Sequence, residues 1–272
     1  MLNTKLAGLL LIISVTALLY HPGHAQEQTA ISEEWQFEIA PYLWLPELDG
    51  DSTLSGVTGP SEFSASELLG FADFVAMGRI EAWKDKWGLF FDGAYLDLGA
   101  DFTVSVPLVT AKVDLDFKQA MLDFGVSYRL LELPMGENGA QKLLFEPLGG
   151  LRYVYLKQEV DIKGPLAGVF PGRRLGGSEE WVEPFVGGRI KWALSETLSL
   201  AVRADIGGFG IGSASDLTWN LVAGFDWRFK ESMSLKVGYR IMDTNYERGR
   251  GSNKFGMDAQ MRGPIIALAM HF

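Results

Sequence analysis

The chain ends with Gly263-Pro-Ile-Ile-Ala-Leu-Ala-Met-His-Phe272 (GPIIALAMHF), and this stretch indicates the class of fold. Every second residue, counted back from the end, belongs to one apolar set: Phe272, Met270, Leu268, Ile266 and Pro264. A period of two is the geometry of a β-strand. An apolar face opposite a face of smaller or polar residues is typical of a strand that meets lipid on one side. We therefore predict a membrane-spanning strand at the end of the chain.

The N-terminus has the pattern of an export signal. Lys5 is followed by an apolar stretch over residues 6–19 and by a short polar region that ends at Ala25. This stretch is shorter than the ~20 residues that a membrane-spanning helix needs, and it suits a cleavable signal peptide. We expect a signal peptide over residues 1–25 and one domain over residues 26–272. The two termini together predict a bacterial outer-membrane location.

Composition narrows the choice further. The chain has no cysteine, which excludes disulfides and thiolate metal sites. Hydrophobic residues make up 47% of the sequence, yet no apolar run after the signal approaches ~20 residues. Strands must therefore cross the membrane. The 32 glycines and the 12% of aromatic residues fit a chain of many strands and turns, with rings at the boundary between lipid and water.

The alternation recurs along the chain. Between Thr218 and Arg228 the odd positions are apolar and the even positions are mostly polar, and residues 119–130 divide in the same way. Repeating the count predicts ten strands, at residues 35–45, 73–83, 87–98, 112–130, 143–160, 180–194, 197–208, 216–229, 233–243 and 260–272. The expected fold is all-β, a transmembrane antiparallel up-and-down barrel. Eight or twelve strands remain alternatives if residues 49–69 pair differently.

Connection lengths orient this barrel. Short connections at residues 84–86, 195–196 and 230–232 alternate with longer ones at 46–72, 161–179 and 244–259, as periplasmic turns alternate with external loops. In the first external segment, Ser64 and Glu67 have the spacing of a capping box that opens a short helix. That helix could fold over the barrel mouth, enter it or lie on its rim.

The eight tryptophans lie near predicted strand ends, where amphipathic rings anchor a barrel in the headgroup layer. Five have outward parity: Trp35, Trp87, Trp192, Trp219 and Trp227. A soluble barrel with core tryptophans is the alternative. Charged inward faces oppose it.

The inward face carries charges of both signs. The residues expected to line the lumen are Glu38, Arg79, Glu81, Asp92, Asp123, Arg129, Glu146, Arg152, Glu183, Arg189, Arg203, Asp205, Asp226, Arg228 and Arg240, with Lys191 and Lys236 on the same face. Buried charges must pair or meet water. These residues therefore form either an ion-pair network that fills the lumen or the lining of a narrow pore.

No enzyme motif is present. The mature domain has one histidine, His271, at the periplasmic end, so a Ser/His or Cys/His nucleophile is excluded on the external side. Asp114 and Asp116 could share a face but look like a solvated strand extension. We expect no catalytic residue, cofactor or metal, and no nucleic-acid partner.

Two external features invite partner hypotheses. Gly207–Gly212 is more consistent with a glycine-rich hairpin than with a phosphate-binding loop, because the required lysine is missing. Basic residues in two external loops suit lipopolysaccharide phosphates or are simply solvated: Arg173, Arg174, Arg248, Arg250 and Lys254.

The chain resembles the small bacterial outer-membrane β-barrel proteins, the porin-like and OmpA-like barrels. The resemblance rests on Trp35–Pro46 (WQFEIAPYLWLP), Arg203–Asn220 (RADIGGFGIGSASDLTWN), Gly238–Arg240 and Phe272. It implies that Phe272 is the assembly signal read by the outer-membrane assembly machinery, and that lipid and lipopolysaccharide are partners. We expect a structural protein or a narrow passive channel for small solutes. A surface protein whose external loops bind lipopolysaccharide, host or envelope components is the alternative.

Overall fold

A computed structural model describes residues 33–106, 109–135, 141–163 and 173–272. These residues belong to one compact unit, which begins at Ile31. The expected signal peptide lies outside the described residues, so its prediction stays open.

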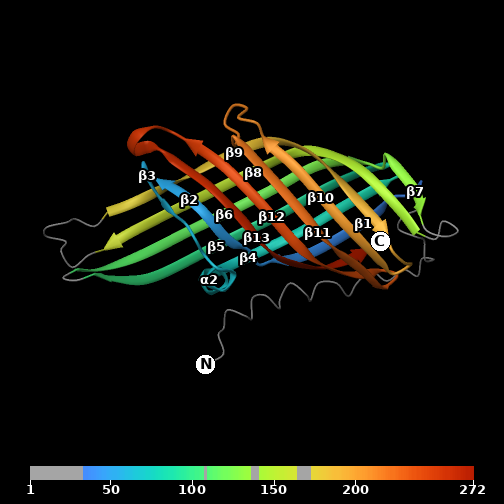
Figure 1. Cartoon of the computed structure of the whole chain (residues 1–272), viewed down its shortest axis with the longest axis horizontal. Coiled ribbons are helices and arrows are strands. Elements are labelled where there is room, and N and C mark those ends of the chain that lie inside the picture. Colours follow the sequence, from blue (N-terminus) through green and yellow to red (C-terminus); the bar gives the residue numbers. More distant parts are fainter. Residues whose placement is uncertain (1–32, 107–108, 136–140, 164–172) are drawn as a thin grey trace, which may run out of the picture. The chain divides into compact units, whose positions relative to one another are not determined.

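Ten antiparallel strands close into a barrel (Figure 1), which confirms the predicted fold class and strand count. They are β1 (Gln36–Trp44), β4 (Ala72–Lys84), β5 (Trp87–Val106), β6 (Val109–Tyr128), β8 (Gln141–Lys163), β9 (Arg173–Ala193), β10 (Leu198–Gly208), β11 (Leu217–Lys230), β12 (Met233–Arg248) and β13 (Phe255–His271). Each strand pairs with the next in this order, and β1 also pairs with β13.

The first and last strands join at the end of the barrel that carries the C-terminus, here called the inner end. The backbone amides of Phe37 and Phe272 each donate to the other residue's carbonyl, at 3.0 and 2.9 Å. The edges of β1 and β13 are thus paired with each other there, as the closure of a membrane barrel requires. The opposite end, here called the outer end, carries the long connection from β1 to β4.

Three further strands were not predicted. β2 (Glu47–Leu54) pairs with the outer part of β13, β3 (Val57–Pro60) pairs with β2, and β7 (Leu131–Met135) pairs with β8 at the inner end. Residues 46–72, expected as an external connection whose pairing was left open, therefore contain two paired strands, while the barrel keeps ten. β13 extends beyond the end of β1, and β2 takes up the free edge. The polar and glycine-rich composition of β2 hid this pairing.

The expected short helix is present as α2 (Ala65–Phe71). Ser64 is its N-cap and forms the capping box with Glu67. The helix lies beside a separation in the barrel wall, because β1 and β4 pair only as far as Pro41 and Gly78. Leu68 and Leu69 line a small apolar pocket of about 30 Å³ in that region, together with residues of β1, β4 and β5. The helix thus covers one side of the wall.

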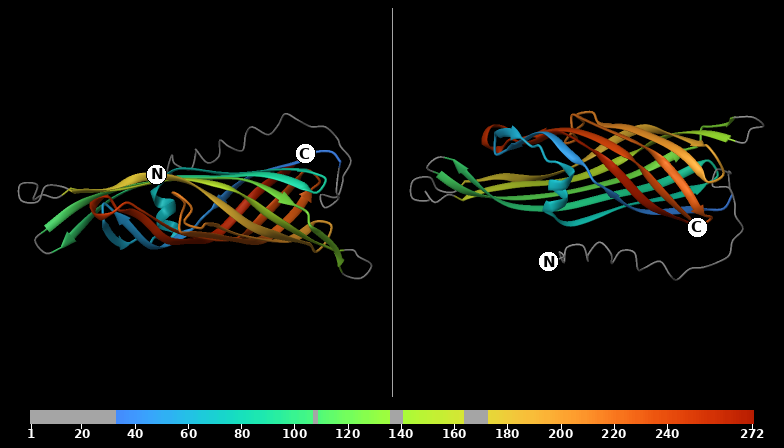
Figure 2. Two further views of the ribbon diagram at one scale, coloured as in Figure 1. Left: turned by 90° about the horizontal axis from the view of Figure 1, so that it is seen from above. Right: turned by 60° about the horizontal axis from the view of Figure 1, so that its bottom comes forward.

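Most strands are longer than predicted, and four of them are the longest in the barrel. β5, β6, β8 and β9 contain 20, 20, 23 and 21 residues, whereas ~9–11 residues suffice to cross a bilayer. The two hairpins project beyond the other strands at the outer end (Figures 1 and 2). Cross-strand ion pairs hold the extension together, including Lys118 with Asp97 at 2.8 Å and Lys157 with Asp116 at 2.7 Å. In the extended part of these strands, charged pairs take the place of the apolar alternation from which the strand ends were predicted.

The outer surface is apolar, as a lipid-facing barrel requires. Trp87 is 60% exposed, Val186 57% and Phe225 51%. All five tryptophans with outward parity lie on this surface, and Trp219 among them is half-buried. The other three, Trp44, Trp83 and Trp181, are buried inside the barrel and are not lipid anchors.

Candidate functional site

The lumen is the candidate site to which the sequence assigned the largest set of residues. All fifteen residues of the predicted lining are buried or half-buried in the structure, and none is exposed. They come from β1, β4, β5, β6, β8, β9, β10, β11 and β12, together with Arg129 just after β6. Each of these side chains lies on the inward face of its strand. Its interactions in the lumen depend on partners from other strands.

Arg152 is the centre of the first ion-pair cluster. Its Nε and Nη2 atoms donate to both carboxylate oxygens of Asp123 at 2.8 and 2.9 Å, and Nη2 also donates to Asp205 at 2.9 Å. Its Nη1 atom lies 3.5 Å from Glu183. Both Arg152 and Glu183 are 0% exposed. One guanidinium therefore compensates carboxylates from three other strands, which is how such charges survive away from water.

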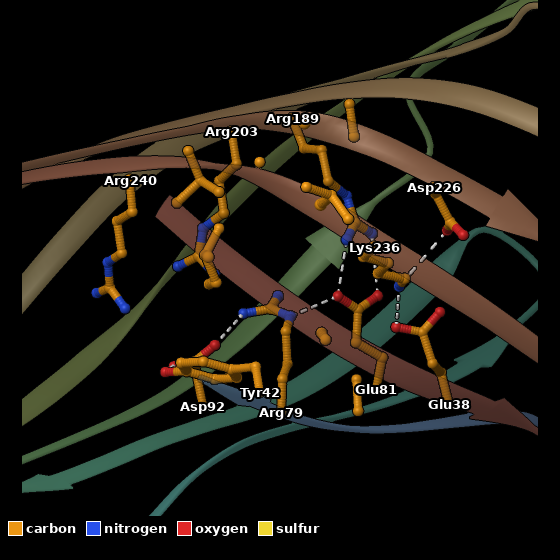
Figure 3. A pocket seen from close by; sticks show the side chains of 18 of the residues that line it. Glu38, Tyr42, Arg79, Glu81, Asp92, Arg189, Arg203, Asp226, Lys236 and Arg240 are labelled. Atoms are coloured by element: carbon orange, nitrogen blue, oxygen red, sulfur yellow. Dashed lines mark hydrogen bonds and ion pairs between the residues drawn. The ribbon is translucent and has the colours of Figure 1, made fainter. Parts of the chain in front are cut away.

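A second cluster crosses the lumen. The Nη1 and Nη2 atoms of Arg189 on β9 donate to the two carboxylate oxygens of Glu81 on β4, at 2.7 and 3.0 Å (Figure 3). Three strands separate β4 from β9 in the sheet, so this bidentate pair spans the interior. Arg79 donates to Glu81 at 2.7 Å and to Asp92 at 3.1 Å. Arg189 also donates to Glu146 at 2.6 Å.

A third cluster lies toward the inner end. Lys236 pairs with Glu38 and lies 3.6 Å from Asp226. Arg228 interacts electrostatically with Asp226 and Glu38. Glu38, Asp226 and Lys236 stand apart from Arg240 and Arg203 in Figure 3, with Glu81 and Arg189 between the two groups.

Aromatic rings pack against the guanidinium groups. Arg129 lies over Trp83 at 4.4 Å, and Arg240 lies over Trp44 at 4.7 Å. Phe90 has Arg79 and Arg203 within 5.0 Å of its ring centre. Such stacking stabilises cations that have lost their hydration. The sequence analysis missed these aromatic partners, although their inward parity was a readable signal.

The outer half of the lumen contains both apolar and polar buried side chains, and Gln158 of the polar set donates to the sulfur of Met257 at 3.5 Å. Its buried apolar residues, here called the apolar cluster, are Trp44, Leu48, Ala94, Met121, Val154, Leu156, Trp181, Met242, Tyr246, Phe255, Met257, Ala259 and Met261. The rings of Trp181 and Tyr246 stack with their centres 3.7 Å apart. The residues come from seven of the ten barrel strands and from β2. Because these strands surround the lumen, their inward side chains are buried by packing against one another across the cross-section of the barrel.

Between the apolar cluster and the inner end lies a cavity of about 170 Å³, here called the chamber. Its basic lining residues are Arg79, Arg189, Lys191, Arg203, Lys236 and Arg240, and its acidic ones are Glu38, Glu81, Asp92, Asp123 and Asp226. Small residues leave the room for it, among them Ala40, Ala201, Gly224 and Ala267. Tyr42 and Asn220 also line it, although neither was among the predicted lining residues; Tyr42 donates to Asp92 at 2.9 Å.

His271 is less isolated than the sequence suggested. Its Nε2 atom is 3.1 Å from Ser234 Oγ, and its Nδ1 atom is 3.6 Å from Glu38. This order of groups is that of a serine nucleophile, a base and an orienting carboxylate. Ser234, however, is 0% exposed, so no substrate reaches its hydroxyl in this conformation. Within the described ranges no set of three or more metal-ligating residues occurs, and no helix is long and apolar enough to span a membrane.

The basic residues at the outer end are partly neutralised. Arg174 pairs with Glu159 at 2.9 Å, Arg248 with Glu179 at 3.3 Å, and Lys254 with Glu247 at 2.6 Å. Gly208, Phe209, Gly210 and Gly212 all have positive φ in the turn between β10 and β11. That stretch is the glycine-rich hairpin expected from the sequence.

No protein-family model matches the chain, and no curated protein matches it. Among solved structures, it is similar to the translocator domain of the autotransporter NalP from Neisseria meningitidis, with 13% identity over 90% of this chain and 91% of that one and a TM-score of 0.45. It is similar to the outer membrane protease OmpT from Escherichia coli, with 9% identity, 90% and 99% coverage and a TM-score of 0.48. It is also similar to Ail of Yersinia pestis in complex with the heparin analogue sucrose octasulfate, with 12% identity, 88% and 98% coverage and a TM-score of 0.30.

The closed barrel and its apolar outer face define the class. The chain is a transmembrane β-barrel of the kind that resides in the outer membrane of Gram-negative bacteria. The resemblance to small outer-membrane barrels, drawn from the terminal strand, is confirmed at the level of fold.

Proposed function

We propose that the protein is a structural outer-membrane barrel whose lumen is closed to passive flow in its outer half. The observation that carries this proposal is the apolar cluster, which draws buried side chains from most of the barrel strands. Water and ions pass poorly through an apolar constriction, because nothing there replaces their hydration. The ion-pair clusters beneath it add stiffness and fill much of the remaining section.

The stacked pair Trp181 and Tyr246 offers a simple test of this closure. Replacing both by alanine removes two large rings from the apolar cluster, and we expect vesicles that contain the variant to release a small trapped dye or ion faster than wild-type vesicles. The matched control replaces Trp192 and Phe225, which face outward, and should leave release at the wild-type rate. Equal release from all three proteins would contradict the proposal.

A second candidate function is surface interaction through the β5–β6 and β8–β9 hairpins. The observation that favours it is their length beyond the span that a bilayer requires, with charged pairs along the extension. Its partner would be lipopolysaccharide or another envelope or host component. Replacing residues 100–115 by an Asn-Gly turn should abolish binding of purified lipopolysaccharide while the barrel still folds. Unchanged binding of lipopolysaccharide would mean that the β5–β6 hairpin is not the binding site.

We further propose that Phe272 is the assembly signal and that the assembly machinery recognises it. Phe272 is 60% exposed at the inner end, so the assembly machinery could contact its ring before the barrel closes. In cells, Phe272→Ala should lower the amount of heat-modifiable barrel in the outer membrane, with Phe225→Ala as an apolar control. Normal assembly of Phe272→Ala would overturn this role.

We also propose that the protein is not a hydrolase. The support is the complete burial of Ser234 beside His271. A fluorophosphonate probe, which labels activated serines, should leave the folded barrel unlabelled. Labelling that disappears in Ser234→Ala would show that the serine is active.

A further inference from the structure

The charges around the chamber are unevenly matched. Each of its five carboxylates has a basic partner within 4 Å: Glu38 and Asp226 have Lys236, Glu81 has Arg79 and Arg189, Asp92 has Arg79, and Asp123 has Arg152. Three basic side chains have fewer hydrogen bonds or ion pairs to carboxylates. They are Lys191, Arg203 and Arg240.

Arg240 is 6% exposed and has no carboxylate within 4 Å among the described residues. Its hydrogen bonds go to Asn220 at 2.9 Å and to the sulfur of Met242 at 3.6 Å, and both acceptors are neutral. The Nη2 atom of Arg203 lies 3.2 Å from Asp205 and 3.7 Å from Asp123, but neither contact has hydrogen-bond geometry, and its buried Nε atom has no hydrogen-bond acceptor in the described structure. Lys191 has no carboxylate within 4 Å among the described residues and interacts with Glu146 and Glu38 only at longer range.

Buried donors of a cation that lack an acceptor are costly. Arg203 and Arg240 both interact electrostatically with Asp92, which places them in one neighbourhood, and both lie toward the same end of the chamber in Figure 3. Asp92 itself is already engaged by Arg79 and Tyr42. An additional acceptor, with negative charge, is what this end of the chamber lacks.

We infer that the chamber binds a small oxyanion, a phosphate or a carboxylate, on Arg203 and Arg240. Guanidinium groups present planar pairs of donors that match the oxygens of such anions. The volume of about 170 Å³ exceeds the ~10–15 Å³ that one water molecule needs, so an anion of a few heavy atoms fits with water around it. The apolar cluster closes the outer side, so the anion enters from the inner end, past Lys191. This inference goes beyond the structural role proposed above and does not depend on conductance.

Calorimetry on the folded barrel tests this inference. Residues 26–272 are refolded in an uncharged detergent, and inorganic phosphate and acetate are titrated separately at constant ionic strength against a chloride background. We expect saturable binding of at least one of them, with the stronger heat identifying the anion class. Arg203→Gln and Arg240→Gln should each weaken binding about tenfold, because each removes a charge-assisted hydrogen bond.

Two matched variants keep the test decisive. Ala201→Leu fills the chamber without removing a charge and should abolish binding, and it serves if an arginine variant fails to fold. Arg262→Gln removes an arginine that is 44% exposed and outside the chamber, and it should bind like wild type. The inference is overturned if the wild-type barrel shows no saturable heat, or if Ala201→Leu binds as well as wild type. Neither result bears on dye release, so the two proposals fail separately.

Discussion

At the residue scale, the lumen depends most on Arg152. It is fully buried and faces three carboxylates, from β6, β9 and β10. Sequence parity placed these residues inside the barrel. It gave no partners, because the pairing of Arg189 with Glu81 joins residues 108 positions apart across the lumen and depends on the register of every strand between them.

Replacing Arg152 by methionine should be strongly destabilising. It keeps much of the side-chain volume but leaves Asp123, Asp205 and Glu183 without their main counter-charge, and breaking a buried pair in this way costs about 3–5 kcal/mol. Urea unfolding of the barrel in lipid vesicles measures the loss. Arg262→Met, at an exposed pair with Glu47, is the control and should cost about 1 kcal/mol or less. A loss for Arg152→Met no larger than the control would refute the central role of this residue.

Glu67 gives a pH dependence at the same scale. Hydrogen bonds from the Ser64 hydroxyl, at 2.6 Å, and from its backbone amide, at 2.9 Å, hold the pKa of Glu67 below its ordinary value of 4.5. Since the folded pKa is the lower one, the stabilisation of α2 is fully present above pH 4.5 and is lost as the pH falls through the folded pKa.

Amide exchange in α2 should therefore speed up, relative to the rest of the barrel, as the pH drops below 4.5. The variant Glu67→Gln keeps a side chain that can accept a hydrogen bond and should lose this dependence. The same acid-induced opening in Glu67→Gln would assign the effect to another group.

At the element scale, the predicted strands were correct in number for the barrel and too short at the outer end. The prediction followed an apolar outward face, which stops where lipid stops. β5, β6, β8 and β9 continue beyond that point with charged cross-strand pairs, which a search for lipid-facing alternation does not detect. β2 was missed for a related reason, since its residues Glu47–Leu54 are mostly polar.

The connection from β1 to β2 passes close to β13 at Gly263. A Cβ atom at Gly263 on β13 would lie 2.0 Å from the carbonyl oxygen of Leu45, because the chain crosses closely there. Gly263→Val should force the two backbones apart and lower the free energy of unfolding by about 1–3 kcal/mol. A Cβ atom at Gly59 would meet none of the described residues within 4 Å beyond its two chain neighbours, so Gly59→Val should be nearly neutral. Equal effects in urea unfolding would contradict the close contact.

At the scale of the whole molecule, the barrel interior has two regions of different chemistry. Charges of both signs line the middle and the inner half, and the apolar cluster lies in the outer half beside a few buried polar side chains, among them Gln119 and Gln158. The mixed inward charges allowed either a pore or a plug, and the sequence could not decide between them. The closure that we propose depends on Trp44, Trp181 and Tyr246. These side chains come together inside the barrel only after β1, β9 and β12 are in place.

Single-channel conductance is the sharpest test of this closure. Residues 26–272 are refolded in detergent, their folding is confirmed by heat-modifiable mobility, and the barrel is inserted into a planar bilayer at moderate salt. The closed outer half predicts a silent membrane, with no discrete steps from the folded wild-type barrel. Discrete and reproducible steps would mean that a continuous aqueous path crosses the apolar cluster, and would contradict the closed lumen.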